Sequence, residues 1–147
     1  MNRDFVEMLQ ALNDARAEYL VVGAHALAAH GRPRATGDLD IWVRPTPENA
    51  TRVFQALAAF GAPLGGVDTS TFSTPEMIFQ IGVIPCRIDV ITSIDGVEFD
   101  DAWPRKVEVN VSGISVPILG RDDLVRNKRA AARPKDLADL ADLEERD

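Results

Sequence analysis

The chain has 147 residues, a formal net charge of −7, 46% hydrophobic residues and a single cysteine, Cys86. This length and composition indicate one compact domain and exclude a disordered chain, and the lone cysteine excludes an internal disulfide and a cysteine-based zinc site. The acidic balance disfavours non-specific nucleic-acid binding. No apolar run approaches the roughly 20 residues of a membrane span, and the mixed, charged N-terminal segment does not resemble a signal peptide. We therefore expect a cytoplasmic protein.

The first part of the chain predicts helices that alternate with strands. Apolar residues recur at helical spacing within 5–12, and the apolar run 19–22 favours a buried strand. Alternation further along places Asp38, Asp40 and Trp42 on one face of a second strand. The elements expected here are helices at 4–16 and 24–30, a polar loop at 32–37, and strands at 19–22 and 38–43.

Capping residues and alternating patterns organise the rest of the chain. Thr46 and Pro47 are typical of a helix start, and Gly61 is typical of its end. The remaining expected elements are a loop at 62–75, strands at 77–83 and 87–92, a helical turn at 99–103 stopped by Pro104, a hairpin of strands at 106–111 and 114–119, and helices at 122–133 and 135–145.

The order of these elements predicts the fold class. Helices and strands are interleaved at first and strands then cluster, which favours an α+β fold over a doubly wound parallel sheet. We expect a mixed sheet of about five or six strands with helices packed on it. The chain would form a single domain, with a core at 1–120 and a C-terminal helical segment at 121–147 in which Leu137, Leu140 and Leu143 are core residues.

Three aspartates stand in strand contexts. Asp38 and Asp40 point to the same side of one strand, and Asp89 lies within the apolar run 87–91. Unpaired buried carboxylates are costly, whereas hard divalent cations prefer oxygen ligands and a pair of metals can clamp a transferring phosphoryl group. The residues alone leave alternatives open: Asp-x-Asp arises by chance in an aspartate-rich chain, Asp89 could be an edge-strand charge or a salt-bridge partner, and Trp42 could stack on a base or lie in the core.

The order of these pieces resembles a known family. Gly23 follows the first strand and precedes a helix and a loop. The next strand carries Asp38 and Asp40 as an Asp-x-Asp motif, and Asp89 lies on a later strand. This pattern resembles the nucleotidyltransferase fold of the DNA polymerase β superfamily, and within it the small bacterial AbiEii-like proteins, over residues 19–143. The resemblance implies that the three aspartates are catalytic and hold Mg²⁺ or Mn²⁺.

The resemblance also implies an NTP site. The residues it assigns to nucleotide binding are Gly23, Ala24, Arg34, Thr36, Lys128 and Asp136. The family carries Gly-Gly or Gly-Ser after the first strand, so Ala24 keeps the backbone amide but lacks a serine hydroxyl. Judged on the residues alone, Gly23 also fits a plain strand-to-helix turn, Lys128 a solvated basic face, and Asp136 either a helix start or a partner of Lys128 or Arg133.

The three aspartates and the resemblance together predict a metal-dependent nucleotidyltransferase that moves a nucleoside monophosphate from an NTP, and the resemblance implies a tRNA or protein acceptor. The resemblance suggests a toxin–antitoxin or defence system, with a cognate antitoxin, another partner protein or a homodimer. The alternative is a catalytically inactive nucleotide- or partner-binding regulator with the same fold. Within 121–135 six basic residues outnumber two acidic ones, so the acceptor could still be a tRNA. A sugar transferase is disfavoured because the chain leaves little room for an acceptor domain.

Overall fold

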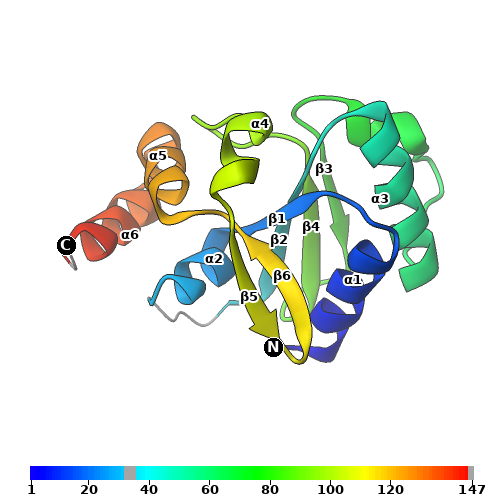
Figure 1. Ribbon diagram of the computed structural model, residues 1–147, viewed down its shortest axis with the longest axis horizontal. Helices are drawn as coiled ribbons and strands as arrows, with labels where there is room; N and C mark the ends of the chain where they lie inside the picture. Colours follow the sequence, from blue (N-terminus) through cyan, green and yellow to red (C-terminus); the bar gives the residue numbers. More distant parts are fainter. Residues whose placement is uncertain (32–35, 146–147) are drawn as a thin grey trace.

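Figure 1 shows the computed structural model, which describes residues 1–31 and 36–145. Within these residues six strands form one sheet in the order β3-β4-β2-β1-β6-β5. The pairs β1–β6 and β2–β4 are parallel and the others antiparallel, so the predicted mixed sheet of an α+β fold is confirmed. The strands are β1 (Tyr19–Val22), β2 (Asp38–Val43), β3 (Ile78–Ile81), β4 (Arg87–Ile91), β5 (Val107–Val111) and β6 (Ile114–Ile118).

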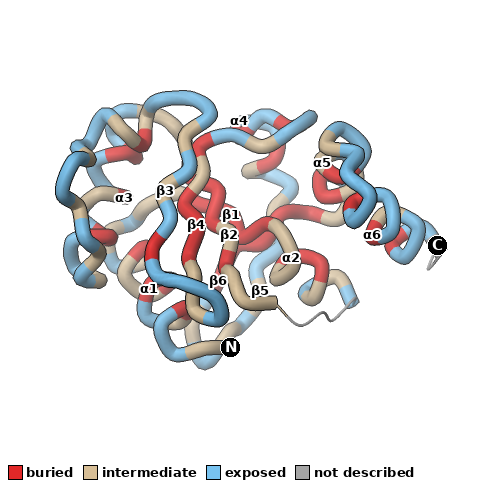
Figure 2. The backbone as a smooth tube through the Cα atoms, turned by 180° about the vertical axis from the view of Figure 1, so that it is seen from behind, coloured by how far each residue is buried: buried red, intermediate tan, exposed pale blue. Residues whose placement is uncertain are grey.

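Helices lie on both sides of this sheet. Helices α1 and α3 pack together on one side, and α2, α5 and α6 lie on the other (Figures 1 and 2). None of the helices in the described parts of the chain is long and apolar enough to cross a membrane. The helices are α1 (Arg3–Asp14), α2 (Gly23–Ala29), α3 (Pro47–Phe60), α4 (Phe99–Ala102), α5 (Arg121–Ala131) and α6 (Pro134–Glu145), with short 3-10 helices η1 (Thr69–Ser73) and η2 (Trp103–Arg105).

The central strands carry the core. Figure 2 shows buried backbone concentrated in β1, β2 and β4. On β2, Leu39, Ile41 and Val43 are fully buried on the face opposite the aspartates, as the alternation predicts. Trp42 is also buried, on the aspartate side, with its ring edge-to-face against Phe99 of α4 at 5.0 Å between centroids, so its core role is confirmed.

The capping residues predicted for α3 act as expected. The Thr46 side chain accepts a hydrogen bond from the Asn49 amide, Pro47 is the first helical residue, and Gly61 ends the helix at φ 93°. A left-handed residue at this position is favourable for glycine because it has no Cβ. Local chemistry therefore fixes both ends of α3.

Two short helical segments differ from the predictions. Within the predicted loop 62–75, residues Thr69–Ser73 form η1, because Asp68 and Thr71 exchange side-chain-to-backbone hydrogen bonds in a capping box. Pro104 does not stop the helical turn after Phe99. It lies near the start of η2, where its missing N–H is not needed.

The predicted leucine core of the last helix is wrong at Leu137, which is 52% exposed. The inward face of α6 instead carries Asp136 and Asp139, each 1% exposed, together with the buried Leu143. The physical reason lies on α5, where the buried Lys128 ammonium forms ion pairs with Asp136 (3.5 Å) and Asp139 (3.1 Å). Buried charges persist where they are paired, so the ion pairs select this face of α6.

Candidate active site

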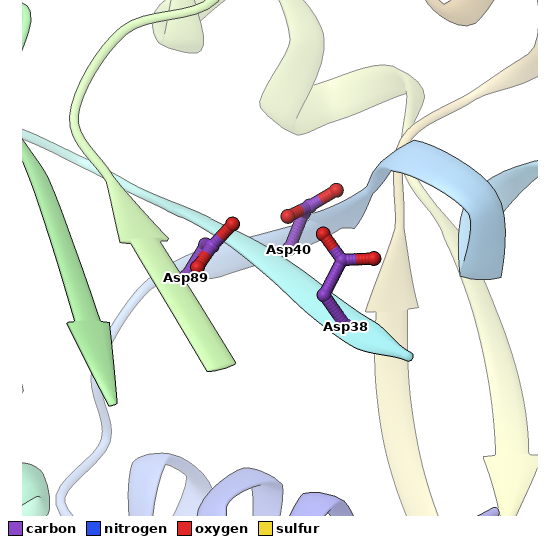
Figure 3. Close-up of side chains that lie close together, drawn as sticks. All are labelled: Asp38, Asp40 and Asp89. Carbon is purple, nitrogen blue, oxygen red and sulfur yellow. The ribbon is translucent and has the colours of Figure 1, made fainter. Parts of the chain in front are cut away.

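The three predicted aspartates meet on one side of the sheet. Strands β2 and β4 are parallel neighbours, and their register places Asp40 opposite Asp89. Figure 3 shows the side chains of Asp38, Asp40 and Asp89 pointing toward a common space. One carboxylate oxygen from each lies within 4.8 Å of the others, so the predicted convergence of the three side chains is confirmed.

Arg87 bridges two of these carboxylates. Its Nη2 donates to Asp38 Oδ2 at 3.0 Å and to Asp89 Oδ2 at 3.3 Å, and its Nε lies 3.1 Å from Asp89 Oδ1 without hydrogen-bond geometry. The Thr36 hydroxyl donates to Asp38 Oδ1 at 2.8 Å. Sequence reasoning missed Arg87, although its position two residues before Asp89 predicts that both side chains share a face.

The surroundings of Asp40 are unfavourable for an ionised carboxylate. Burial and the neighbouring charges of Asp38 and Asp89 raise the pKa of Asp40 to about 7, and a hydrogen bond with Asp89 adds to the effect. Arg87 contacts only Asp38 and Asp89, so Asp40 has no guanidinium partner there, and the donor set of the three side chains is all oxygen. Such a set fits a hard divalent cation such as Mg²⁺ or Mn²⁺, which would supply the missing positive charge.

Gly23 is required by its closeness to Asp40. It follows β1 directly at φ 67°, and a Cβ added to it would lie 2.2 Å from Asp40 Oδ2. A side chain at position 23 would therefore be strained and would displace the carboxylate. The predicted strand-to-helix turn is confirmed, and it brings the backbone of Gly23 and Ala24 beside the acidic site.

Lys128 is buried and does not lie on a solvated basic face, whereas Asp136 lies in the first turn of α6, where its side chain accepts a hydrogen bond from the Arg133 amide at 3.2 Å. Asp136 contacts both suggested partners, Lys128 at 3.5 Å and Arg133, whose Nε donates to Asp136 Oδ2 at 2.6 Å. Burial raises the pKa of Asp136, but the hydrogen bonds and charge of Arg133, together with the charge of Lys128, outweigh burial and lower the pKa below its usual value. Both predicted residues therefore lie in an ion-paired junction between α5 and α6.

The start of α6 adds positive charge near the aspartates. The Lys135 charge lowers the pKa of Asp40, opposing the larger effects of burial and repulsion, and the Asp40 charge contributes to the raised pKa of Arg133. Sequence reasoning missed both residues as site candidates, although the basic strip 121–135 contains them. The predicted residue Arg34 lies outside the described residues.

Comparison with known proteins supports the fold. No protein-family model matches the chain, and no curated protein sequence matches it. A candidate nucleotidyltransferase from Thermotoga maritima has a similar structure, with a TM-score of 0.59 and 16% identity over 100% of this chain and 97% of that one. The lincosamide antibiotic adenylyltransferase LnuA, solved with lincomycin bound, has a TM-score of 0.62 and 13% identity over 98% of this chain and 96% of its own.

These similarities cover both partners almost entirely, so the whole described chain corresponds to the fold of nucleotidyltransferases. At this level of identity the likeness concerns architecture alone. The expected nucleotidyltransferase fold is thereby supported by the comparisons, and its AbiEii-like subgroup stays a prediction.

Proposed function

We propose that the protein is a metal-dependent nucleotidyltransferase. The observation that carries this proposal is the meeting of Asp38, Asp40 and Asp89 from two parallel strands, with oxygens within 4.8 Å. Burial and repulsion raise the pKa of Asp40 to about 7, an electrostatic cost that a bound divalent cation removes. The nucleotidyltransferase fold of the structural neighbours supports the same class of activity.

The three aspartates would have different roles at the metal. Asp38 and Asp40 would hold Mg²⁺ or Mn²⁺, and Asp89 would complete the ligand set. When bound, the metal supplies positive charge that stabilises the oxygens of the transferring phosphoryl group. Arg87 restrains Asp38 and Asp89 through its guanidinium, so these ligands are held in position before substrates arrive.

The proposed reaction joins a hydroxyl to the α-phosphate of an NTP. The acceptor oxygen attacks the α-phosphorus, the bond from that phosphorus to the bridging oxygen breaks, and pyrophosphate leaves. Asp89 would accept the hydroxyl proton, a role that the family resemblance suggests. The nucleoside monophosphate then remains on the acceptor.

The phosphates would lie on the β1 side of the acidic site. Backbone amides of Gly23 and Ala24 begin α2 beside Asp40 and would donate to phosphate oxygens. Thr36 would contribute from beside Asp38, and Arg34 stays a predicted contact. The two backbone amides and the Thr36 hydroxyl are neutral donors, so the charge of the triphosphate would need cations, from Arg34 and from elsewhere.

The α5–α6 junction supplies such cations. Lys128 and Asp136 would act on the nucleotide by holding the start of α6, from which Arg133 and Lys135 act on the site. Direct contact of Lys128 with phosphate would require it to leave its buried partners. The proposed role of this pair is therefore to position neighbouring charges.

The biological setting is proposed from the sequence resemblance. A small AbiEii-like nucleotidyltransferase would be cytoplasmic and would modify a tRNA or a protein, within a toxin–antitoxin or defence system and with an antitoxin or a second copy as partner. The neighbour LnuA is named for transfer to an antibiotic, which adds small hydroxyl compounds to the candidate acceptors.

The test is transfer of a labelled nucleotide. Purified protein would be incubated with each α-labelled NTP, Mg²⁺ or Mn²⁺, and fractionated cell lysate. We expect labelling that falls by on the order of 10²–10³-fold or more in Asp38→Asn and Asp40→Asn, and that is unchanged in the control Asp14→Asn, an exposed carboxylate on α1. Equal labelling by the site variants and the native protein would refute the proposal.

Calorimetry distinguishes the alternative, an inactive nucleotide- or partner-binding regulator. Ala24, which replaces the serine or glycine of the family pattern, would weaken triphosphate binding, whereas the presence of all three aspartates argues against inactivity. An inactive regulator would bind NTP without turnover, and its affinity would be the same after removal of divalent cations. The proposed enzyme instead predicts that chelation weakens NTP binding.

A further inference from the structure

The edge of the sheet formed by β3 lies beside the acidic site. The strand order begins with β3 next to β4, and among the described residues no strand pairs with the other side of β3. In Figure 3, β3 is the green strand at the left, beside the strand that carries Asp89. The register pairs Gln80 with Asp89 and Ile78 with Ile91, so the side chains of Gln80 and Ile78 stand on the same face of the sheet as the aspartates.

The backbone of β3 offers hydrogen-bonding groups along this edge. The Thr92 amide donates to the Met77 carbonyl at 3.1 Å, which makes these two residues a hydrogen-bonded pair. Hydrogen-bonded and non-hydrogen-bonded pairs alternate along an antiparallel ladder, so the N–H and C=O groups of Ile78 and Gln80 point away from β4. Within the described residues, neither of the two makes a backbone hydrogen bond outside the sheet.

The side chains along this edge are exposed and uncharged. Gln80 is exposed, and Ile78 is 64% exposed although it is a large apolar residue. The β3 sequence Ile-Phe-Gln-Ile contains no lysine or proline, the residues that commonly protect an edge strand from pairing. The opposite edge, β5, carries Glu108 and lies at the far end of the sheet from the acidic site. Of the two edges, β3 is therefore the one suited to pair with another strand near the aspartates.

The chemistry of this edge selects an extended peptide as its partner. Outward N–H and C=O groups at alternate residues match the backbone of another strand, and such strand addition is a common mode of peptide recognition. RNA needs cations to bind its phosphates, whereas β3 has none and is preceded by the exposed carboxylate of Glu76. A peptide is therefore favoured over RNA at this edge.

A bound strand would direct one side chain toward the acidic site. The peptide residue opposite Gln80 would share the face of the aspartates. Its Cα would lie roughly 10 Å from that of Asp89, because two inter-strand steps separate them. A hydroxyl at this position must reach across Gln80, and tyrosine has the longest hydroxyl-bearing side chain. The geometry therefore favours tyrosine over serine or threonine.

The position of β3 also matches the direction of the proposed reaction. In the sheet, β2 lies between β1, which leads to Gly23, and β4, which carries Asp89, and β3 lies beyond β4. The proposed phosphates lie on the Gly23 side, and the attacking hydroxyl must approach the α-phosphorus from the opposite side. A hydroxyl that arrives from the β3 edge approaches from that side.

We propose that an extended segment of an acceptor protein pairs with the free edge of β3 and brings a tyrosine hydroxyl to the acidic site. The role as acceptor rests on the proposed function, whereas the pairing of a peptide with β3 rests on the geometry of the edge alone. In the reaction the phenolic oxygen bonds to the α-phosphorus of the NTP, and the bond from that phosphorus to the bridging oxygen breaks. Pyrophosphate leaves with the bonding electrons, and the phenolic proton passes to Asp89.

Backbone amide signals in a proton–nitrogen NMR spectrum test the pairing directly. The probe is a pool of five-residue peptides, capped at both ends, with tyrosine at the centre and valine, isoleucine, threonine or glutamine at each flanking position. We expect saturable shifts of the amide signals of Ile78 and Gln80. The signals of Glu108 and Asn110 on β5, the opposite edge, serve as the internal control and should not move.

N-methylated pools provide matched controls. Methylation of the tyrosine nitrogen removes the N–H that would donate to the Gln80 carbonyl, whereas methylation of the preceding residue changes an N–H that faces away from β3. We expect the first pool to bind about tenfold more weakly and the second to bind equally. In the protein, Ile78→Pro removes an outward N–H without breaking a bond to β4, and it should weaken binding about two- to tenfold while the circular dichroism spectrum stays native.

Several outcomes would overturn the proposal. These are β3 signals that do not move at 5 mM total peptide, and β3 signals that move equally with the two methylated pools. A shift caused only by a CCA trinucleotide would assign the edge to RNA. A change of the Ile78 and Gln80 signals on dilution, without peptide, would assign the edge to a second copy of the chain.

The NMR measurement needs neither NTP nor metal, so the two proposals fail separately. Incubation with α-labelled NTP should label the tyrosine pool and leave a pool with phenylalanine at the centre unlabelled. If the β3 signals respond but no labelled nucleotide is transferred to any acceptor, the peptide-binding edge stands and the enzymatic function fails. If the protein labels cell lysate but not the tyrosine pool, the enzymatic function stands and the tyrosine acceptor at β3 is overturned.

Discussion

Replacing Asp40 by asparagine should stabilise the protein while removing a ligand of the proposed metal site. The folded state raises the pKa of Asp40 from 3.8 to about 7, chiefly through burial and then through Asp38 and Asp89. Since a tenfold change in proton affinity corresponds to about 1.4 kcal/mol, the ionised carboxylate costs the folded state up to about 4 kcal/mol. For a domain of this size that corresponds to roughly 8–16 °C in Tm at most.

The sign of the pH dependence follows from the direction of the shift. A pKa raised on folding means that the folded state binds the proton more tightly, so the contribution of Asp40 to stability is greatest below pH 4 and is lost as the pH rises to about 7. Asp40→Asn should therefore have a higher Tm than the native protein at pH 8, with the difference disappearing near pH 4. The asparagine keeps the shape of the side chain and carries no charge.

Thermal unfolding followed by circular dichroism, from pH 4 to pH 8, measures this effect. Addition of 10 mM Mg²⁺ at pH 8 should raise the Tm of the native protein and leave Asp40→Asn unchanged, because the variant lacks a ligand. Glu76→Gln, at an exposed turn before β3, serves as the control and should show no such pH dependence. A variant no more stable than the native protein at pH 8 would refute the assigned electrostatic cost.

Further predictions concern the groups around the acidic site. Gly61→Ala should cost roughly 1–2 kcal/mol because its φ is positive, and Gly23→Ala should cost at least as much, because its Cβ would also lie 2.2 Å from Asp40 Oδ2. Only Gly23→Ala should weaken Mn²⁺ binding measured by calorimetry, since an added Cβ at Gly61 meets no atom within 4 Å; equal Mn²⁺ affinities would contradict this. Lys128→Met should lower the free energy of unfolding, measured in urea, by about 3–5 kcal/mol. The control Arg129→Met, which removes an exposed ion pair, should lower it by about 0–1 kcal/mol. Similar losses in the two variants would show that the buried pair is not structural. Lys135→Ala should shift the pH midpoint of Mn²⁺ binding to higher pH, because Lys135 lowers the pKa of Asp40. An unchanged or lower midpoint would show that Lys135 does not act on the site.

The sequence predicts those parts of the fold that depend on neighbouring residues. Helix α3 is bounded by Thr46, Pro47 and Gly61, whose preferences act within a few residues, and its limits match the prediction. Strand β2 likewise shows its two faces in its alternation. The pairing of β2 with β4 cannot be deduced from local patterns, and the meeting of Asp40 with Asp89 was predicted through the family resemblance.

The missed features are long-range charge pairs. Arg87 binds Asp38 across 49 sequence positions, and no spacing rule connects residues on different strands. The orientation of α6 depends on Lys128, a residue of another helix, so the leucine periodicity misplaced Leu137 while the aspartates took the inward face. Amphipathic patterns assume that buried positions are apolar, and a buried ion pair breaks that assumption.

The parallel pairing of β2 with β4 determines which changes in the chain leave the acidic site intact. Residues 44–86 connect the two strands and include α3, η1 and β3. Because Asp40 and Asp89 face one another through adjacent backbones, an insertion in this long connection would leave them together, whereas a slip of β4 by one position would turn Asp89 to the opposite face. The surface formed by residues 44–86 can therefore change in length and composition while the three aspartates stay together.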